Sequence, residues 1–148
     1  MTKEAETTAQ QQIRALLNDR AAAITGRDAT RALAYYAPEV VSFLLHPPLR
    51  YAGDVVRDPA GMESWFRSWD GPIGYDIGEP VIEAGNDVAF CHGLTHMTGT
   101  TTDGEHVDVW FRSTVGLRRT AAGWRIAHEH ESTPFYDDSG LAATDLRP

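Results

Sequence analysis

The second half of the chain, from Ile73 onward, is a series of strand-like segments separated by short turn sequences. The turns read "GND" at 85–87, "TTDG" at 101–104 and "TAAG" at 120–123. The segments between them are rich in β-branched and aromatic residues and alternate with a period of two, as in "WRIAHEHES" at 124–132. Alternating segments joined by glycine-containing turns are typical of β-hairpins. The sequence therefore predicts four consecutive antiparallel strands.

The first half of the chain is predicted to be mainly helical. Apolar residues at helical spacing predict a first helix over about residues 5–25, which Gly26 ends. A short second helix over 29–37 and a strand over 39–45 follow. Asp58-Pro59 is a typical helix start, and the third helix after it has an apolar stripe of Met62, Trp65, Phe66 and Trp69.

This order of elements indicates an α+β fold in which the helices cover one face of a curved, mostly antiparallel sheet. The length of 148 residues fits one domain over 1–148, with a polar extension at 1–9 and an irregular tail at 133–148.

Composition excludes several classes of partner. The formal net charge of −8 disfavours nucleic acid and anionic membranes. No apolar run approaches the roughly 20 residues needed to span a bilayer. The polar N-terminus is unlike a secretory signal, and a single cysteine, Cys91, fits a reducing cytoplasm. We therefore expect a cytoplasmic protein that acts on small molecules.

The turns also predict which residues face each other. A three-residue loop at 102–104 pairs Thr101 with Glu105, so that His96 lies opposite Trp110 and Thr98 opposite Asp108. A similar loop at 121–123 pairs Thr120 with Trp124, so that Thr114 lies opposite His130. Both registers place even-numbered residues on one face: His92, Leu94, His96, Asp108, Trp110, Arg112, Thr114, Ile126, His128 and His130. A two-residue turn at Asp103-Gly104 would instead move His92 and His96 to the other face.

We interpret this even-numbered face as the lining of a pocket. The opposite face of the strand at 105–117 carries Val107, Val109, Phe111, Val115 and Leu117, which is too apolar for solvent. A homodimer that buries this second face would explain it.

An aspartate beside histidines in an apolar cavity can perform general acid/base chemistry. Asp108 with His130 is the predicted base, and His96 is a second proton carrier. Arg112 could stabilise a developing oxyanion, or it could stack on Trp110 or Trp65. Asp108 could alternatively form a structural pair with Arg112.

Other aromatic side chains are candidates for contacts with the substrate. His46, in the loop "HPP", is a candidate for the rim of the pocket, and Trp65 and Trp69 border its mouth unless they belong to the core. His92, Trp110 and His128 complete the predicted substrate-binding set, although His128 also fits a hydrogen-bonded core position. The four histidines His92, His96, His128 and His130 could together bind zinc. No H-E-x-x-H motif or cysteine cluster accompanies them, so we expect no metal.

Several motifs resemble a known family. "YYAPEVVSF" at 35–43, "DVAF" at 87–90, "DGEHVDVWFRST" at 103–114 and "GWRIAHEHESTPF" at 123–135 resemble SnoaL-like proteins. These proteins belong to the NTF2-like superfamily, which includes nuclear transport factor 2 and ketosteroid isomerase. The resemblance extends over about residues 10–136. It implies a cone with an apolar pocket at its open end, a dimer, and chemistry without metal or cofactor.

The resemblance covers isomerases, polyketide cyclases and dehydratases as well as non-catalytic domains, so the fold alone does not fix a function. The sequence predicts a cofactor-independent enzyme that transfers protons on a small, largely apolar carbonyl compound. The alternative is a small-molecule-binding or dimeric scaffold domain without catalysis.

Overall fold

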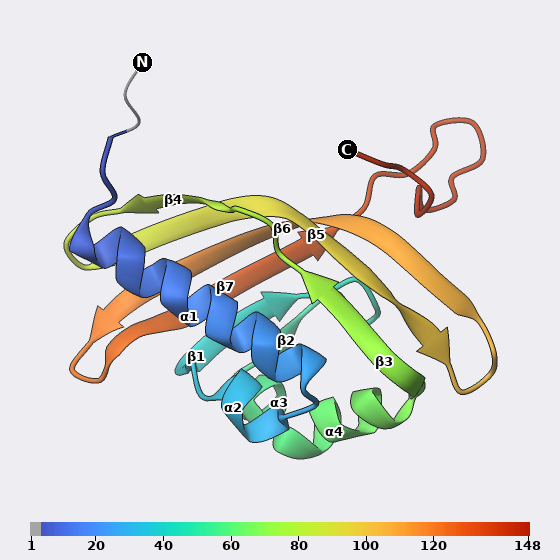
Figure 1. Cartoon of the computed structure of the whole chain (residues 1–148), viewed down its shortest axis with the longest axis horizontal. Helices are drawn as coiled ribbons and strands as arrows, with labels where there is room; N and C mark the ends of the chain where they lie inside the picture. The colour runs from blue at the N-terminus through green and yellow to red at the C-terminus, as the bar shows by residue number, and fades with distance from the viewer. Residues whose placement is uncertain (1–3) are drawn as a thin grey trace.

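The computed structural model describes residues 4–148 and confirms the α+β architecture. A long helix, α1 (Thr8–Thr25), runs beneath the concave face of a strongly curved sheet (Figure 1). Three shorter helices, α2 (Ala29–Leu33), α3 (Asp54–Arg57) and α4 (Pro59–Arg67), gather at one end of the same face. The opposite, convex face of the sheet has no helix over it in the described part of the chain.

The sheet is formed from seven strands within residues 4–148. Their order is β2-β1-β7-β6-β5-β3, with β4 paired to β5. The pairing of β1 with β7 is parallel, and the other pairings are antiparallel. The bounds are β1 (Tyr36–Phe43), β2 (Tyr51–Ala52), β3 (Trp69–Asp76), β4 (Val81–Ala84), β5 (Val88–Thr101), β6 (His106–Thr120) and β7 (Gly123–Ser132).

The helix starts follow from capping chemistry. Thr7 and Gln10 form a reciprocal capping box at the start of α1, and the Asp58 side chain accepts from the backbone N–H of Ala60 before Pro59 opens α4. The third helix was predicted to reach Trp69, but α4 ends at Arg67 and Trp69 begins β3 opposite Thr101. Trp69 is buried in β3, as it would be on the apolar stripe of a longer helix. Its spacing from the other apolar residues therefore did not distinguish a helix from a strand at this position.

The predicted register of the β5–β6 hairpin is confirmed. His96 lies opposite Trp110, and Thr98 lies opposite Asp108. The backbone N–H of Thr101 donates to the Glu105 carbonyl at 2.9 Å. Gly104 has a positive φ of 83°, the left-handed conformation that the third position of this loop requires.

The β6–β7 hairpin differs from its predicted form near the turn. Thr120 pairs with Gly123 rather than with Trp124, because the turn contains only two residues. A bulge then restores the predicted pairing of Thr114 with His130: Leu117 lies opposite Ile126, whereas Gly116 lies opposite His128. One residue of β7, Ala127, is therefore extra, and such an insertion reverses the alternation of faces along a strand.

The concave face carries the odd-numbered residues of β5 and β6, so the predicted assignment of the pocket face is wrong. Cys91, Val115 and Leu117 pack in one core cluster with the α1 residues Ile13, Leu16 and Leu17. Val109 and Phe111 are also buried within the monomer. These side chains cannot form the predicted dimer interface, because the protein's own interior covers them. The homodimer itself stays a prediction.

Among residues 4–148, no helix combines the length and the apolar character that a membrane crossing would require.

Candidate active site on the concave face

A buried ion pair lies between α1 and the sheet. Arg20 and Glu129 are only 9% and 3% exposed, and the Arg20 Nη2 atom lies 3.1 Å from Glu129 Oε2. The same Nη2 donates to the Tyr36 hydroxyl at 2.5 Å. A buried ion pair is tolerated when further hydrogen bonds complete its coordination, and here β1 supplies them.

The Glu129 carboxylate accepts two additional hydrogen bonds from β1. The Tyr36 hydroxyl donates to Glu129 Oε1 at 2.6 Å, and the Ser42 hydroxyl donates to the same atom at 3.0 Å. Burial raises the pKa of Tyr36 well above its usual value, so this hydroxyl keeps its proton for donation. Helix α1, strand β1 and strand β7 thus converge on one carboxylate.

The β7 bulge explains why glutamates rather than histidines reach this site. Trp124 and Ile126 face the core, at 4% and 0% exposed. After the extra residue Ala127, the odd-numbered positions take over the concave face, so Glu129 and Glu131 point inward. In "HEHES" it is therefore the glutamates that face α1.

Glu131 is the carboxyl group in this region that is best suited to proton transfer. It pairs across the sheet with Ser113, and none of the hydrogen bonds found within residues 4–148 involves its carboxyl group. Burial and the negative charge of Glu129 raise the pKa of Glu131 to about 8, against a smaller opposing effect of Arg20. A carboxyl group that titrates near neutral pH and has no internal partner is suited to exchange protons with a ligand.

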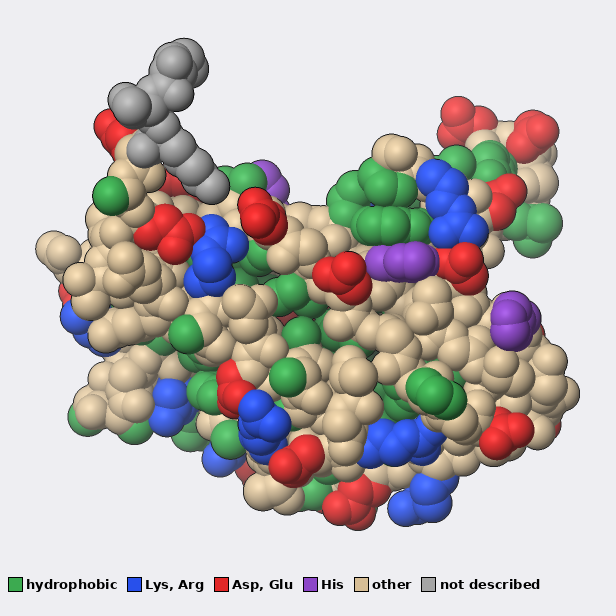
Figure 2. All heavy atoms as spheres, in the orientation of Figure 1, with side chains coloured by type: hydrophobic (Ala, Val, Ile, Leu, Met, Phe, Trp, Pro, Cys, Tyr) green, Lys and Arg blue, Asp and Glu red, His purple; other side chains and the backbone are tan. Residues whose placement is uncertain are grey.

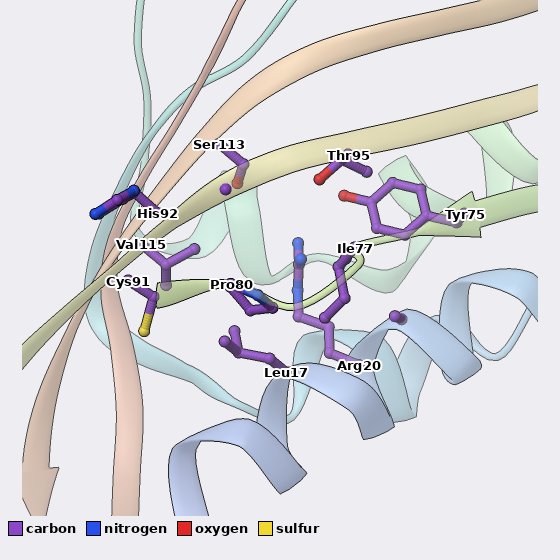
Figure 3. A pocket seen from close by; sticks show the side chains of 12 residues that line it. Leu17, Arg20, Tyr75, Ile77, Pro80, Cys91, His92, Thr95, Ser113 and Val115 are labelled. Carbon is purple, nitrogen blue, oxygen red and sulfur yellow. The ribbon is translucent and has the colours of Figure 1, made fainter. Parts of the chain in front are cut away.

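A cavity of about 40 Å³ opens beside this cluster (Figure 3). Arg20 rises into it from α1, and Thr95 and Ser113 point into it from the sheet above. Its apolar wall consists of Leu17, Ala21, Ile77, Pro80, Cys91 and Val115. The cavity thus combines an apolar wall with a few converging polar groups, as ligand sites commonly do.

Tyr75, on β3, completes the polar part of the cavity. Its hydroxyl lies beside Thr95 in Figure 3. Burial and the charge of Glu131 raise the pKa of Tyr75, so the hydroxyl remains a hydrogen-bond donor at physiological pH. Arg20 Nε is buried without a partner among the described residues. A ligand oxygen in the cavity would therefore meet donors from two different elements.

The convex face carries a second charged cluster, which contains the predicted site residues His96, Asp108 and Trp110. His96 Nε2 lies 2.6 Å from Asp108 Oδ1, and the His96 ring stacks on Trp110 with ring centroids 4.4 Å apart. Arg147, from the C-terminal tail, donates to both Asp108 oxygens at 2.8 and 2.9 Å. The cluster is at the surface, since the Arg147 and Asp108 side chains are 56% and 44% exposed, and Figure 2 shows a histidine among acidic and basic side chains on the surface in this orientation. The Arg147 and His96 hydrogen bonds hold the pKa of Asp108 below its usual range.

The other predicted site residues do not join this cluster. The predicted Asp108–His130 pair is not formed, and Arg112 is exposed and is not the cation bound by Asp108. His130 packs against Phe43. His128 Nδ1 lies 2.6 Å from the Val41 carbonyl oxygen, so His128 is hydrogen-bonded as predicted, but it is half-buried on the convex face rather than in the core. The prediction that even-numbered residues line the pocket was wrong, because the alternation of a strand shows which residues share a face but not which face the helices cover.

The predicted substrate-binding residues are scattered. His92 lines the edge of the cavity and also stacks with Phe90. Trp65 and Trp69 pack against each other at the core, with their ring centroids 5.6 Å apart. His46 lies in an exposed loop beside Tyr51. Among residues 4–148, no three His, Cys, Asp or Glu side chains are grouped to hold a metal ion.

The sequence interpretation missed Arg20, Tyr36, Ser42, Tyr75, Glu129 and Glu131. Arg20 did carry a signal, because it is a charged residue at an apolar position of the first helix, and such a residue needs a buried partner. The glutamates carried none, because their inward direction depends on the bulge.

A helix held in the concave face of a curved sheet, with a polar cavity between them, defines the cone-shaped class of the nuclear transport factor 2-like proteins. The model of the SnoaL-like domain matches residues 13–136. The chain therefore belongs to the SnoaL-like family, as its motifs predicted.

Solved structures agree with this assignment. A protein of unknown function from Pseudomonas putida KT2440, described as NTF2-like, is 30% identical with a TM-score of 0.86, and the match covers 98% of this chain and 100% of that one. A nuclear transport factor 2-like superfamily protein from Salmonella enterica serovar Typhimurium is 21% identical with a TM-score of 0.76, over 92% and 98% of the two chains.

A ketosteroid isomerase-like protein from Erwinia carotovora atroseptica is 23% identical with a TM-score of 0.71, over 86% and 97% of the two chains. The similarity to this protein and to the Salmonella protein concerns the fold alone. No curated protein matches the chain.

Proposed function

We propose that the protein is a cofactor-independent enzyme that transfers protons on a small carbonyl compound bound in the concave cavity. The observation that carries this proposal is Glu131, a half-buried carboxyl group beside Glu129 that has no hydrogen-bond partner within residues 4–148 and whose pKa is raised to about 8. A carboxylate with such a pKa is a much stronger base than an ordinary glutamate.

Each polar group has a distinct role in this mechanism. Glu131 removes a proton from the carbon next to the carbonyl group and returns it to another position, which covers isomerisation and dehydration. Arg20 and Tyr75 donate hydrogen bonds to the oxygen on which negative charge develops. Glu129, held by Tyr36 and Ser42, fixes the guanidinium of Arg20 in place.

Exchange of carbon-bound hydrogen tests this function without knowledge of the natural substrate. In D₂O, the wild-type protein should accelerate deuterium incorporation next to the carbonyl group of 4-hydroxybutan-2-one, measured by ¹H NMR. The rate should rise with pH through about 8, as Glu131 loses its proton. Glu131→Gln should lower the catalysed rate by roughly 10²- to 10⁴-fold, the usual contribution of a general base.

The convex face supplies the matched control, Asp108→Asn, which should leave the exchange rate unchanged because Asp108 does not line the cavity and lies on the other face of the sheet. A wild-type protein that binds the ketone without accelerating exchange would refute catalysis and favour the alternative, a non-catalytic binding domain. If Asp108→Asn loses the exchange rate and Glu131→Gln keeps it, the proton transfer takes place on the convex face and the role proposed for Glu131 is wrong.

A further inference from the structure

Two hydroxyl groups in the roof of the cavity have no role in the proposed proton transfer. Thr95 is only 3% exposed, yet its hydroxyl takes part in none of the hydrogen bonds found within residues 4–148 and points into the cavity (Figure 3). The Ser113 hydroxyl points into the same space from β6. Buried hydroxyl groups normally find partners, so an unpaired one aimed into a cavity indicates a position where a ligand or water supplies the missing bond.

The sheet register places these groups next to Glu131. Ser113 lies directly opposite Glu131, and Gly93, two residues before Thr95, lies opposite Ser113. Residues directly opposite in antiparallel strands have side chains about 5 Å apart, and diagonal neighbours are about 7 Å apart. Glu131, Ser113 and Thr95 therefore form a short polar row across the concave face, with Arg20 below it.

The two ends of this polar region differ in the hydrogen bonds they can make. Arg20 can only donate, so it suits a carbonyl or enolate oxygen. Serine and threonine hydroxyls both donate and accept, so a pair of them suits another hydroxyl group, which does the same. A carbonyl oxygen at that end would use only half of the capacity of the pair.

We propose that Thr95 and Ser113 form a hydroxyl-binding subsite and that the ligand is a small hydroxy-carbonyl compound, with its carbonyl group toward Arg20 and its hydroxyl group toward the subsite. The carbon skeleton lies against Leu17, Ile77, Pro80 and Val115. At roughly 10 Å³ for each water-sized position, a cavity of about 40 Å³ holds a compound of a few carbon atoms rather than a polycyclic one. This inference rests on the proposed function for the position of the carbonyl group.

Two probes of nearly equal size test the subsite. 4-Hydroxybutan-2-one and pentan-2-one differ only by a hydroxyl group in place of a terminal methyl group. NMR titration of the wild-type protein should give a dissociation constant about 5- to 10-fold lower for the hydroxy-ketone, the effect of one or two ordinary hydrogen bonds. Thr95→Val with Ser113→Ala should remove this preference and leave the affinity for pentan-2-one within about twofold.

The neighbouring residue Thr114 provides the control, because it faces the convex side opposite His130. Thr114→Val should keep the preference for the hydroxy-ketone. Ser113→Ala alone should weaken the preference, which keeps the test decisive if Thr95→Val does not fold. Equal affinities of the wild-type protein for the two probes, or no binding of either, would overturn the subsite.

Failure of the subsite and failure of the proposed function give different results. If Glu131→Gln abolishes hydrogen exchange while the probes bind with equal affinity, the subsite is wrong and the proton transfer stands. If the hydroxyl preference depends on Thr95 and Ser113 but no exchange occurs, the cavity binds hydroxy-carbonyl compounds without catalysis.

Discussion

The two faces of the sheet carry similar groups in opposite environments. On the concave face Arg20 binds Glu129 with side chains 11% and 4% exposed, whereas on the convex face Arg147 binds Asp108 with side chains 56% and 44% exposed. The pKa of Glu131 is raised by burial beside Glu129, whereas the pKa of Asp108 is lowered by its exposed cationic partners. An ion pair alone therefore does not identify an active site. The deciding feature is a carboxyl group whose pKa burial raises to near neutral pH.

The largest expected difference between the faces is in stability. Glu129→Gln removes the charge that balances the buried guanidinium of Arg20, and breaking a buried ion pair in this way typically costs about 3–5 kcal/mol. Urea denaturation followed by tryptophan fluorescence measures this loss. Arg20→Met should cost a similar amount, because it leaves Glu129 without its cation. A loss below about 1 kcal/mol in both variants would mean that the concave cluster is hydrated like a surface pair.

Glu131→Gln should produce the next largest effect, a stabilisation whose size depends on pH. The folded-state pKa is raised from 4.5 to about 8, so the folded protein retains a proton that the unfolded chain releases between these values. Wild-type stability therefore falls as the pH rises through this window, and the amide variant lacks this loss. The free energy of unfolding of the variant, relative to that of the wild type, should therefore rise by roughly 2–4 kcal/mol as the pH is raised from about 4.5 to about 9.

The same urea experiment at both pH values measures this gain, and the difference between variant and wild type cancels the other titrating groups. A difference that does not change with pH would show that the two states bind the Glu131 proton equally.

The smallest effect is expected on the convex face. Asp108→Asn removes one exposed ion pair with Arg147 and the contact with His96, and exposed pairs contribute little because water and salt screen them. The urea midpoint should shift only slightly at low salt, and the shift should disappear at high salt. Because the pKa of Asp108 is lowered, any stabilisation is present near neutral pH and is lost as the pH falls below its usual value. A large shift that persists in salt would contradict the contrast between the faces.

Local chemistry explains what the sequence could predict. The capping residues, the glycine of the 102–104 loop and the alternation of β5 and β6 act within a few residues, so the helix starts and the β5–β6 register followed from them. The motifs shared with SnoaL-like proteins predicted the cone-shaped arrangement of these elements. The contact of His96 with Asp108 was also within reach, because both residues lie on the predicted shared face.

The site itself depended on two long-range facts. Which face of the sheet meets α1 is decided by the packing of the whole chain, and the row of histidines suggested the wrong one. The bulge at Ala127 has no glycine in β7 itself, and Gly116, which lies beside it on β6, does not show from the sequence which strand carries the extra residue. The bulge turns Glu129 and Glu131 inward and His128 and His130 outward. A single inserted residue therefore moved the candidate chemistry from histidines to glutamates.

The most direct test of the two-face account is a ¹³C NMR titration of side-chain carboxyl groups in the wild-type protein, with Glu131 and Asp108 assigned through their variants. Glu131 should titrate near pH 8 and Asp108 below its usual range, in the same sample. Titration of Glu131 near the ordinary glutamate value of about 4.3 would contradict the account, because its carboxyl group would then be an ordinary solvated one.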